Sequence, residues 1–264
     1  MRFFKILHSF FSSLGFNLLK IKNILIVLKF IIKKLLWKLN LDLIKKKINF
    51  DEIYKIKIKN NPIIFDVGAN SGQSIERFLT IFPKARIDSF EPIKSCRDIM
   101  QKKYINKNIF INNLGLGRKN SKKKFYISNY DPCSSFLKND LHKLDKNFKY
   151  FKTKEIININ LTTIDNYLRS NNIKRIDILK IDIQGTELEV LKGATYAFKK
   201  KIIKFIELEV IIKAHYKNQN NFYKIDKILS DNKFRLYNLH EFNYEENFIV
   251  TQFDALYINT QINI

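Results

Sequence analysis

Short apolar runs alternate with stretches of helical periodicity between residues 63 and 258. Apolar runs bounded by turn residues are typical of strands buried on both faces of a sheet. The pattern predicts strands at 63–67, 86–91, 109–111, 176–182, 202–210, 234–239 and 253–258, and helices at 73–82, from Pro92 to about Tyr104, at 161–170, 187–198 and 222–229. Strands and helices that alternate in this way form βαβ units, so we expect a largely parallel α/β sheet with helices on both faces.

Residues 118–160 interrupt the alternation. This segment is rich in lysine, carries a short strand signal at 125–127 and has a turn at Asp131–Ser135. Loops inserted into a sheet commonly carry specificity. We therefore expect substrate-binding elements in this segment.

Residues 1–50 differ in composition from the rest of the chain. The stretch 18–43 has neither Pro nor Gly and permits one long helix. At about 100° per residue, one lysine-free arc of this helix carries Ile21, Ile24, Leu25, Leu28, Ile31, Ile32, Leu35, Leu36 and Leu39. Such a surface needs a partner, either an anionic membrane surface or a protein surface. The sequence thus predicts a basic, apolar helical extension at 1–50 and a folded domain at 51–264, with the oligomeric state open.

The length and the charge of the chain limit the functions that it can have. A chain of 264 residues can build one large α/β domain with an appendage. The formal charge of +23 favours anionic partners, but the lysines are scattered and no stacking-aromatic motif of a common RNA module is present, which does not favour nucleic acid. Cys96 and Cys133 have no zinc-ligand spacing. The absence of a signal-peptide pattern and of a lysine-free span predicts a cytoplasmic protein, peripheral to the membrane if the extension binds it.

Polar residues gather where the predicted strands end. The first strand, 63–67, runs into a turn between Gly68 and Gly72, and a helix follows with free backbone N–H groups. Carboxylates stand at or near four strand ends, at Asp66, Glu91, Asp182 and Glu209. Ligands of open parallel sheets bind at the carboxyl ends of the strands, so these acids indicate a shared cleft.

Three ordered motifs resemble the FkbM family of S-adenosylmethionine-dependent methyltransferases. They are Phe65–Gly72, Phe90–Pro92 and Leu179–Glu187 continuing through Val190–Ala194, and the similarity covers roughly residues 60–258. The resemblance implies a Rossmann-like class I methyltransferase fold, with a seven-stranded sheet whose last strand is antiparallel. It also implies S-adenosyl-L-methionine as cofactor and O-methylation of sugars or other glycan and secondary-metabolite hydroxyls.

The resemblance also implies cofactor contacts. The turn Gly68–Gly72, including Ser71, would hold the amino-acid end of the cofactor, with Asp66 accepting from its ammonium group. Asn70 would add a polar contact to the methionine part. Glu91 would accept hydrogen bonds from both ribose hydroxyls, a task that suits a group with only acceptor sites.

Transfer to an alkyl hydroxyl requires a base within hydrogen-bond reach. Asp182 is the first candidate, and Glu209 and His215 are the other two. The alternatives are a helix-capping role for Asp182 and a solvent-exposed loop position for His215. Gln184 stands where the family more usually has Glu, which argues against that position as base or metal ligand. Asp182 and Glu209 alone are too few to assert a metal site.

The leading hypothesis is an S-adenosylmethionine-dependent O-methyltransferase acting on a small-molecule, sugar or glycan acceptor. The basic charge leaves open an RNA-binding protein or an RNA methyltransferase. The N-terminal extension and Gln184 leave open an inactive membrane-associated scaffold.

Overall fold

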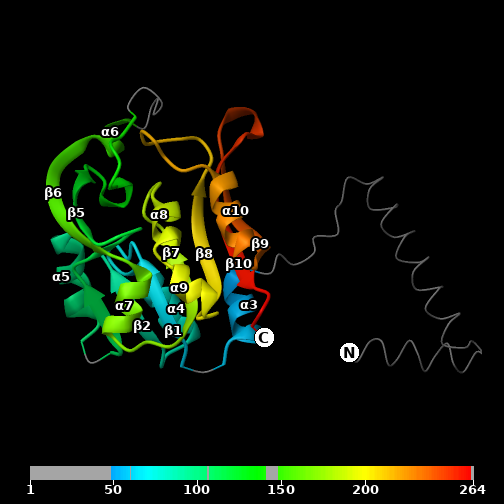
Figure 1. Ribbon diagram of the computed structural model, residues 1–264. Helices are drawn as coiled ribbons and strands as arrows, with labels where there is room; N and C mark the ends of the chain where they lie inside the picture. The colour runs from blue at the N-terminus through cyan, green and yellow to red at the C-terminus, as the bar shows by residue number, and fades with distance from the viewer. Residues whose placement is uncertain (1–48, 60, 106, 141–147, 263–264) are drawn as a thin grey trace, which may run out of the picture. The chain divides into compact units, whose positions relative to one another are not determined.

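A computed structural model describes residues 49–59, 61–105, 107–140 and 148–262 (Figure 1). The helix expected at 18–43 lies outside the described residues, as does all of the predicted extension 1–50 except its last two positions. Helix α3 (Phe50–Lys57) begins the described chain, where the sequence reading assigned no element. Asn49 caps it by accepting the backbone N–H of Glu52 at 2.8 Å.

Seven strands form the central sheet. They are β1 (Ile63–Val67), β2 (Arg86–Phe90), β3 (Ile109–Asn112), β7 (Ile176–Ile181), β8 (Ile203–Ile211), β9 (Phe234–Tyr244) and β10 (Val250–Asn259). Their order is β3-β2-β1-β7-β8-β10-β9, and β10 runs antiparallel to both of its neighbours while the remaining pairs are parallel. The expected mostly parallel sheet with an antiparallel final strand is confirmed.

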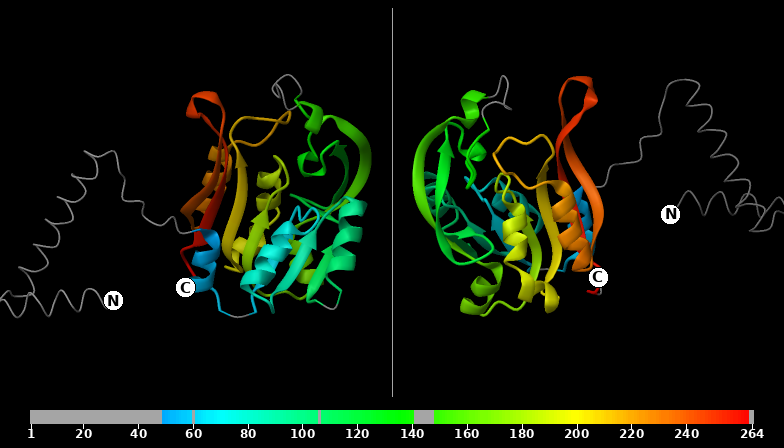
Figure 2. Two further views of the ribbon diagram at one scale, coloured as in Figure 1. Left: turned by 180° about the vertical axis from the view of Figure 1, so that it is seen from behind. Right: turned by 45° about the horizontal axis from the view of Figure 1, so that its top comes forward.

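Helices cover both faces of this sheet (Figures 1 and 2). One face carries α3, α4 (Gln73–Ile81) and α5 (Lys94–Lys103), and the other carries α7 (Ile164–Ser170), α8 (Glu187–Lys192), α9 (Thr195–Lys199) and α10 (Phe222–Asp231). Strand alternation separates the two apolar layers: Ile64 packs with the first set of helices, and Phe65 and Val67 pack with the second. Among the described residues, no helix is long and apolar enough to cross a membrane.

A smaller sheet accounts for the interrupted segment. It has the order β4-β6-β5 and is built from β4 (Gly115–Leu116), β5 (Ser121–Ser128) and β6 (Thr153–Thr162), with η1 (Asp131–Cys133) and α6 (Phe148–Phe151) between its long strands. The strand signal at 125–127 thus falls in the second half of β5. In Figure 1 this green sheet curves over one end of the central sheet, beside α5.

Two predicted helix boundaries were wrong. The helix expected at 161–170 begins at Ile164, because Leu161 and Thr162 belong to β6 and pair with β4; Thr163 is its N-cap. The helix expected at 187–198 is two helices, α8 and α9. The carboxylate of Asp165, from α7, accepts the backbone N–H groups of Tyr196 and Ala197 in the first turn of α9. A cap supplied from another helix leaves no local sequence signal.

Candidate active site

The turn after β1 has its glycines for packing reasons. Gly68 and Gly72 have φ of +86° and +92°, which side-chain-bearing residues rarely adopt. A Cβ on Gly68 would lie 1.9 Å from the carbonyl oxygen of Asp182, and one on Gly72 would lie 2.8 Å from the ring of Tyr104. The sequence predicted a sharp turn at both glycines and close approach of a ligand. The φ values fit the turn, and the structure shows close approach of the chain to itself.

Glu91 ties the ends of β1 and β2 together. Its side chain is 3% exposed, and its two oxygens accept the backbone N–H groups of Asn70 at 2.8 Å and of Ile93 at 2.7 Å. Burial raises the pKa of the Glu91 carboxyl to about 7. Each oxygen keeps a second lone pair for a ligand. The side chain of Asn70 forms a hydrogen bond within the turn, because its Oδ1 accepts the backbone N–H of Ser71 at 2.7 Å.

Asp66 has a free acceptor atom. Its Oδ2 accepts the hydroxyl of Ser74 at 2.7 Å, while its fully buried Oδ1 has no hydrogen-bond partner among the described residues. Burial raises the pKa of Asp66. An orphaned buried acceptor beside the glycine turn requires an explanation.

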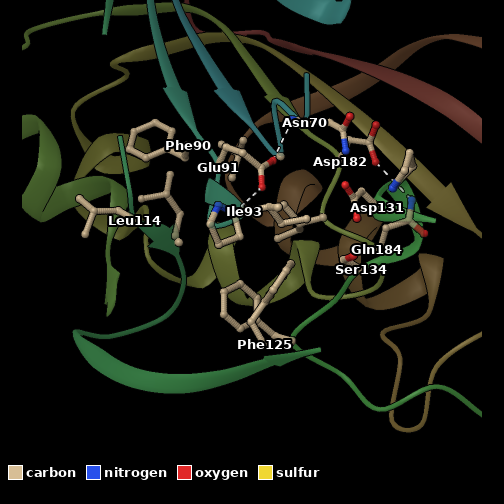
Figure 3. A pocket seen from close by; sticks show the side chains of 18 of the residues that line it. Asn70, Phe90, Glu91, Ile93, Leu114, Phe125, Asp131, Ser134, Asp182 and Gln184 are labelled. Carbon is tan, nitrogen blue, oxygen red and sulfur yellow. Dashed lines mark hydrogen bonds between the residues drawn. The ribbon is translucent and has the colours of Figure 1, made fainter. Parts of the chain in front are cut away.

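A cavity of about 150 Å³ opens at the carboxyl ends of β1, β2 and β7. One end is apolar, lined by Phe90, Ile93, Leu114 and Phe125, and the other is polar, lined by Asp182, Gln184 and Glu209 (Figure 3). Asp131 and Ser134, from the segment around η1, complete the wall. Part of the 118–160 segment therefore does line the cavity, as the sequence led us to expect.

Two acids share the polar end. Lys180 Nζ lies 3.1 Å from Asp182 Oδ2, and Gln184 Nε2 donates to Asp182 Oδ1 at 3.4 Å and also to Glu209 Oε2. Gln252, from β10, donates to the other oxygen of Glu209. The capping alternative for Asp182 does not match this geometry. It is instead Glu187 Oε1 that accepts the turn amide of Gly185, at 2.9 Å.

The two acids differ in pKa. Burial pushes the pKa of Asp182 upward, but the ammonium group of Lys180 outweighs it and leaves the pKa below its usual value. Burial and the neighbouring Asp182 carboxylate together raise the pKa of Glu209 well above its usual value. Two carboxyl groups so close cannot both ionise easily. Asp182 therefore ionises first, and Glu209 keeps its proton to a higher pH than an ordinary glutamate does.

The structure does not bring all the expected residues to the cavity. Asp66, Asn70, Glu91, Asp182 and Glu209 meet at one edge of the sheet, as expected. Gly72, Ser71 and His215 do not line the cavity, and neither does Asp66, whose side chain is fully buried on β1.

The ring of His215 lies 5.1 Å from that of Phe151, and its Nδ1 is buried without a hydrogen-bond partner among the described residues. Burial lowers the pKa of this imidazole. Within the same residues, no group of three or more His, Cys, Asp or Glu side chains could hold a metal ion.

The sequence reading missed Lys180, Gln252 and Tyr216. Lys180 had a signal, because a lysine two residues before Asp182 in a strand lies on the same face of the sheet. Gln252 and Tyr216, whose hydroxyl donates to Gln184 Oε1 at 2.9 Å, come from distant segments and had none.

Comparison with known proteins decides what kind of site this is. The family model described as "Methyltransferase FkbM domain" matches residues 66–236. The chain belongs to the FkbM methyltransferase family. It is an S-adenosylmethionine-dependent methyltransferase, as the three motifs led us to expect.

Two curated relatives resemble this FkbM methyltransferase. Methyltransferase sdnD of Sordaria araneosa is 28% identical over 185 residues, covering 59% of this chain and 70% of its own. The 2-O-methyltransferase NoeI of Sinorhizobium fredii is 24% identical over 178 residues, covering 64% and 71%. The magnesium protoporphyrin IX methyltransferase of Synechocystis, solved with bound S-adenosylmethionine, is similar with a TM-score of 0.43 at 11% identity, covering 76% of this chain and 71% of its own.

Proposed function

We propose that this FkbM-family enzyme methylates a hydroxyl group of a sugar, a glycan or a glycan precursor. The observation that carries the proposal is the pair formed by Asp182 and Glu209, two carboxyl groups at the polar end of the cavity that both accept from the amide of Gln184. The pKa of Asp182 is lowered and that of Glu209 is raised. A hydroxyl group that accepts a methyl must lose its proton, and a fixed carboxylate can take it. NoeI, one of the relatives, is named as a 2-O-methyltransferase.

Two further acids suit the cofactor: Glu91, which lines the cavity, and Asp66, which is buried on β1. Glu91, through its remaining lone pairs, would accept the ribose hydroxyls, and Asp66 Oδ1 would accept from the ammonium group. When bound, S-adenosylmethionine supplies a methyl group made ready for transfer by its positive sulfonium. Positioning the acceptor hydroxyl is then the main task left to the protein.

Asp182 is the proposed base. Lys180 holds its Oδ2 and keeps it ionised, so Oδ1 is the oxygen that takes the proton of the acceptor. Glu209, whose pKa is raised, accepts from the amides of Gln184 and Gln252 and fixes the other side of the pair. His215 stays a weaker candidate because it does not line the cavity.

The cofactor end is tested by Glu91→Ala. We expect the variant to lose the micromolar binding of S-adenosylhomocysteine that titration calorimetry should measure for the parent chain, because the ribose acceptor is gone and the amides of Asn70 and Ile93 lose their partner. Glu76→Ala is the control, since Glu76 is an exposed acid on α4 paired with Lys103. Circular dichroism verifies that both variants fold. Normal binding by a folded Glu91→Ala variant would overturn the site assignment.

The acceptor class is tested by methyl transfer from labelled cofactor to fractionated native glycans and lipids. We expect label in a glycan or glycan-precursor fraction. Label only in RNA would favour the RNA methyltransferase reading, which rests on the +23 charge. S-adenosylhomocysteine binding without transfer to any fraction would favour the inactive scaffold.

We further propose that the extension ahead of Asn49 brings the enzyme to an anionic membrane surface from the cytoplasmic side. Residues 1–48 contain eleven of the 48 Lys and Arg residues but only one of the 25 acids, together with the apolar arc of the predicted helix. A basic, apolar helix is the kind of segment that lies in the headgroup region of a membrane.

A further inference from the structure

A second, basic cavity adjoins the cofactor cavity. Its volume is about 180 Å³, far more than the roughly 30 Å³ that one water molecule takes up in the liquid. The two cavities share the side chains of Leu116 and Phe136, so a molecule in one lies next to a molecule in the other. The polar residues that line the basic cavity are Arg118, Lys119, Ser121, Lys123, Thr186 and Glu189.

The positive charge of this cavity is not compensated. Within the described ranges, the side chains of Arg118, Lys119 and Lys123 form no ion pair. Glu189 is the one carboxylate in the lining, and it forms an ion pair with Lys192, whose Nζ lies 2.7 Å from Glu189 Oε1. Three cations around one hollow create a field that attracts an anion.

Thr186 gives the second, independent indication of a ligand. Its side chain is 9% exposed, and its Oγ1 is fully buried with no hydrogen-bond partner among the described residues. Although Thr186 immediately precedes α8, its side chain makes no capping bond to that helix. A buried hydroxyl without a partner is rare in folded proteins, and here it belongs to a residue that lines the cavity.

The strand β5 directs one lysine of a run of three toward the cavities. Successive side chains of a strand point to opposite faces, so Lys123 shares a face with Phe125, which lines the cofactor cavity. Lys122 and Lys124 lie on the other face of β5, and neither lines the basic cavity. Lys122 therefore offers a control that matches Lys123 in charge, strand and exposure.

We propose that the basic cavity binds a phosphate group of the methyl acceptor. Ammonium, guanidinium and hydroxyl groups supply only donors or positive charge here, and a phosphate group offers acceptor oxygens and negative charge. The shared wall of Leu116 and Phe136 places this group beside the cavity that contains Asp182. The assignment to the acceptor rests on the proposed function; the assignment of an anion site does not.

The anion site is tested by titration calorimetry of inorganic phosphate into the full chain saturated with S-adenosylhomocysteine. We expect Lys123→Gln and Thr186→Val each to weaken phosphate binding by about fivefold or more, and Lys122→Gln to leave it unchanged. Thr186→Val should melt at the same temperature as the parent or higher, because it removes an unpaired buried hydroxyl. Equal weakening by Lys122→Gln, or none by Thr186→Val, would show a diffuse surface field and overturn the site. If phosphate displaces S-adenosylhomocysteine, the cations of the basic cavity belong to the cofactor site. This outcome would also overturn the proposal.

The source of the phosphate is tested with the labelled glycan fractions. We expect treatment of the accepting fraction with phosphatase and pyrophosphatase to abolish labelling, and Lys123→Gln to raise KM for the untreated fraction with little change in kcat. Undiminished labelling after treatment would mean that the cavity binds free phosphate and would overturn the link to the acceptor. If no fraction is labelled while Lys123-dependent phosphate binding persists, the proposed function fails and the anion site stands.

Discussion

Gln184 fits the charge distribution of the site. Its amide nitrogen donates to both acids of the pair, and its Oε1 accepts the hydroxyl of Tyr216 at 2.9 Å. An ionised glutamate at this position could donate to neither acid and would add a third carboxylate to a site with one nearby ammonium group. Gln184 therefore holds Asp182 and Glu209 together without adding a charge, whereas the motif alone showed only a departure from the family pattern.

The carboxyl group of Asp254 allows a raised pKa to be tested at a single residue. Burial, and then the like charges of Glu207 and Asp182, raise its pKa to about 7, and its carboxylate makes no hydrogen bond to another described residue. The folded state therefore binds this proton more tightly than the unfolded state does. The contribution of the group to stability is complete below the ordinary carboxyl pKa and is lost as the pH rises to about 7.

Asp254→Asn removes this loss. We expect the variant to match the parent in free energy of unfolding near pH 4, and to exceed it by on the order of 2 kcal/mol at pH 8. Urea unfolding at the two pH values measures the difference. Asp231→Asn, at an exposed position on α10, is the control and should differ from the parent equally at both values. A constant difference for Asp254→Asn as well would contradict the raised pKa.

At the scale of elements, an ion pair with a buried carboxylate joins α3, α4 and β8. Arg77 of α4 donates to both oxygens of Glu207 of β8, at 2.9 and 2.6 Å. Tyr54 of α3 adds its hydroxyl at 2.7 Å, and Asp51 of α3 lies 3.3 Å from Arg77 Nε. Glu207 is 2% exposed, so its charge depends on these partners. The cluster secures the first helix of the described chain to the middle of the sheet.

Arg77→Leu should therefore lower the free energy of unfolding by about 3 kcal/mol or more, because it leaves a buried carboxylate without its cation. The double variant Arg77→Leu/Glu207→Leu should recover a large part of this loss. The comparison is Lys103→Leu, which breaks an exposed pair with Glu76 on the same helix α4 and should cost less than about 1 kcal/mol. Urea unfolding of all four proteins decides the matter: equal losses for Arg77→Leu and Lys103→Leu would refute the role of the buried pair.

At the scale of the whole molecule, charge is distributed unevenly. Residues 1–48 hold nearly a quarter of the cations of the chain and almost none of its acids, whereas the basic cavity lies within the folded domain. We therefore expect two separate anionic partners, one for each region. Removal of residues 1–48 should weaken binding of the partner of that region and leave binding of the partner of the basic cavity unchanged.

A chain that begins at Asn49 tests this separation. The cut keeps the N-cap of α3 and the buried Phe50, both of which a cut after residue 50 would remove. We expect the shortened protein to lose binding to anionic liposomes in a sedimentation assay, and to keep its affinity for S-adenosylhomocysteine and inorganic phosphate. Neutral liposomes are the control. Undiminished binding of the shortened protein to anionic liposomes would disprove the membrane role of the extension.

The sequence by itself determined the order and type of the elements and the edge where the site lies. Apolar runs and helical periodicity are local properties, and parallel strands necessarily end at one edge, so Asp66, Glu91, Asp182 and Glu209 could be placed together from the sequence. The glycine turn after β1 was readable for the same reason, although not its cause, which is contact with Asp182 and Tyr104.

Only the tertiary structure decided how the pKa values of these acids differ and where a second ligand fits. The raised pKa of Glu209 depends on burial and on the carboxylate of Asp182 from another strand. Gln252, which donates to Glu209, reaches it through the antiparallel register of β10 with β8. The basic cavity likewise combines β5 with Thr186, which lie far apart in the chain. A pKa and a cavity depend on distances and burial between remote segments, and local periodicity carries no information about either.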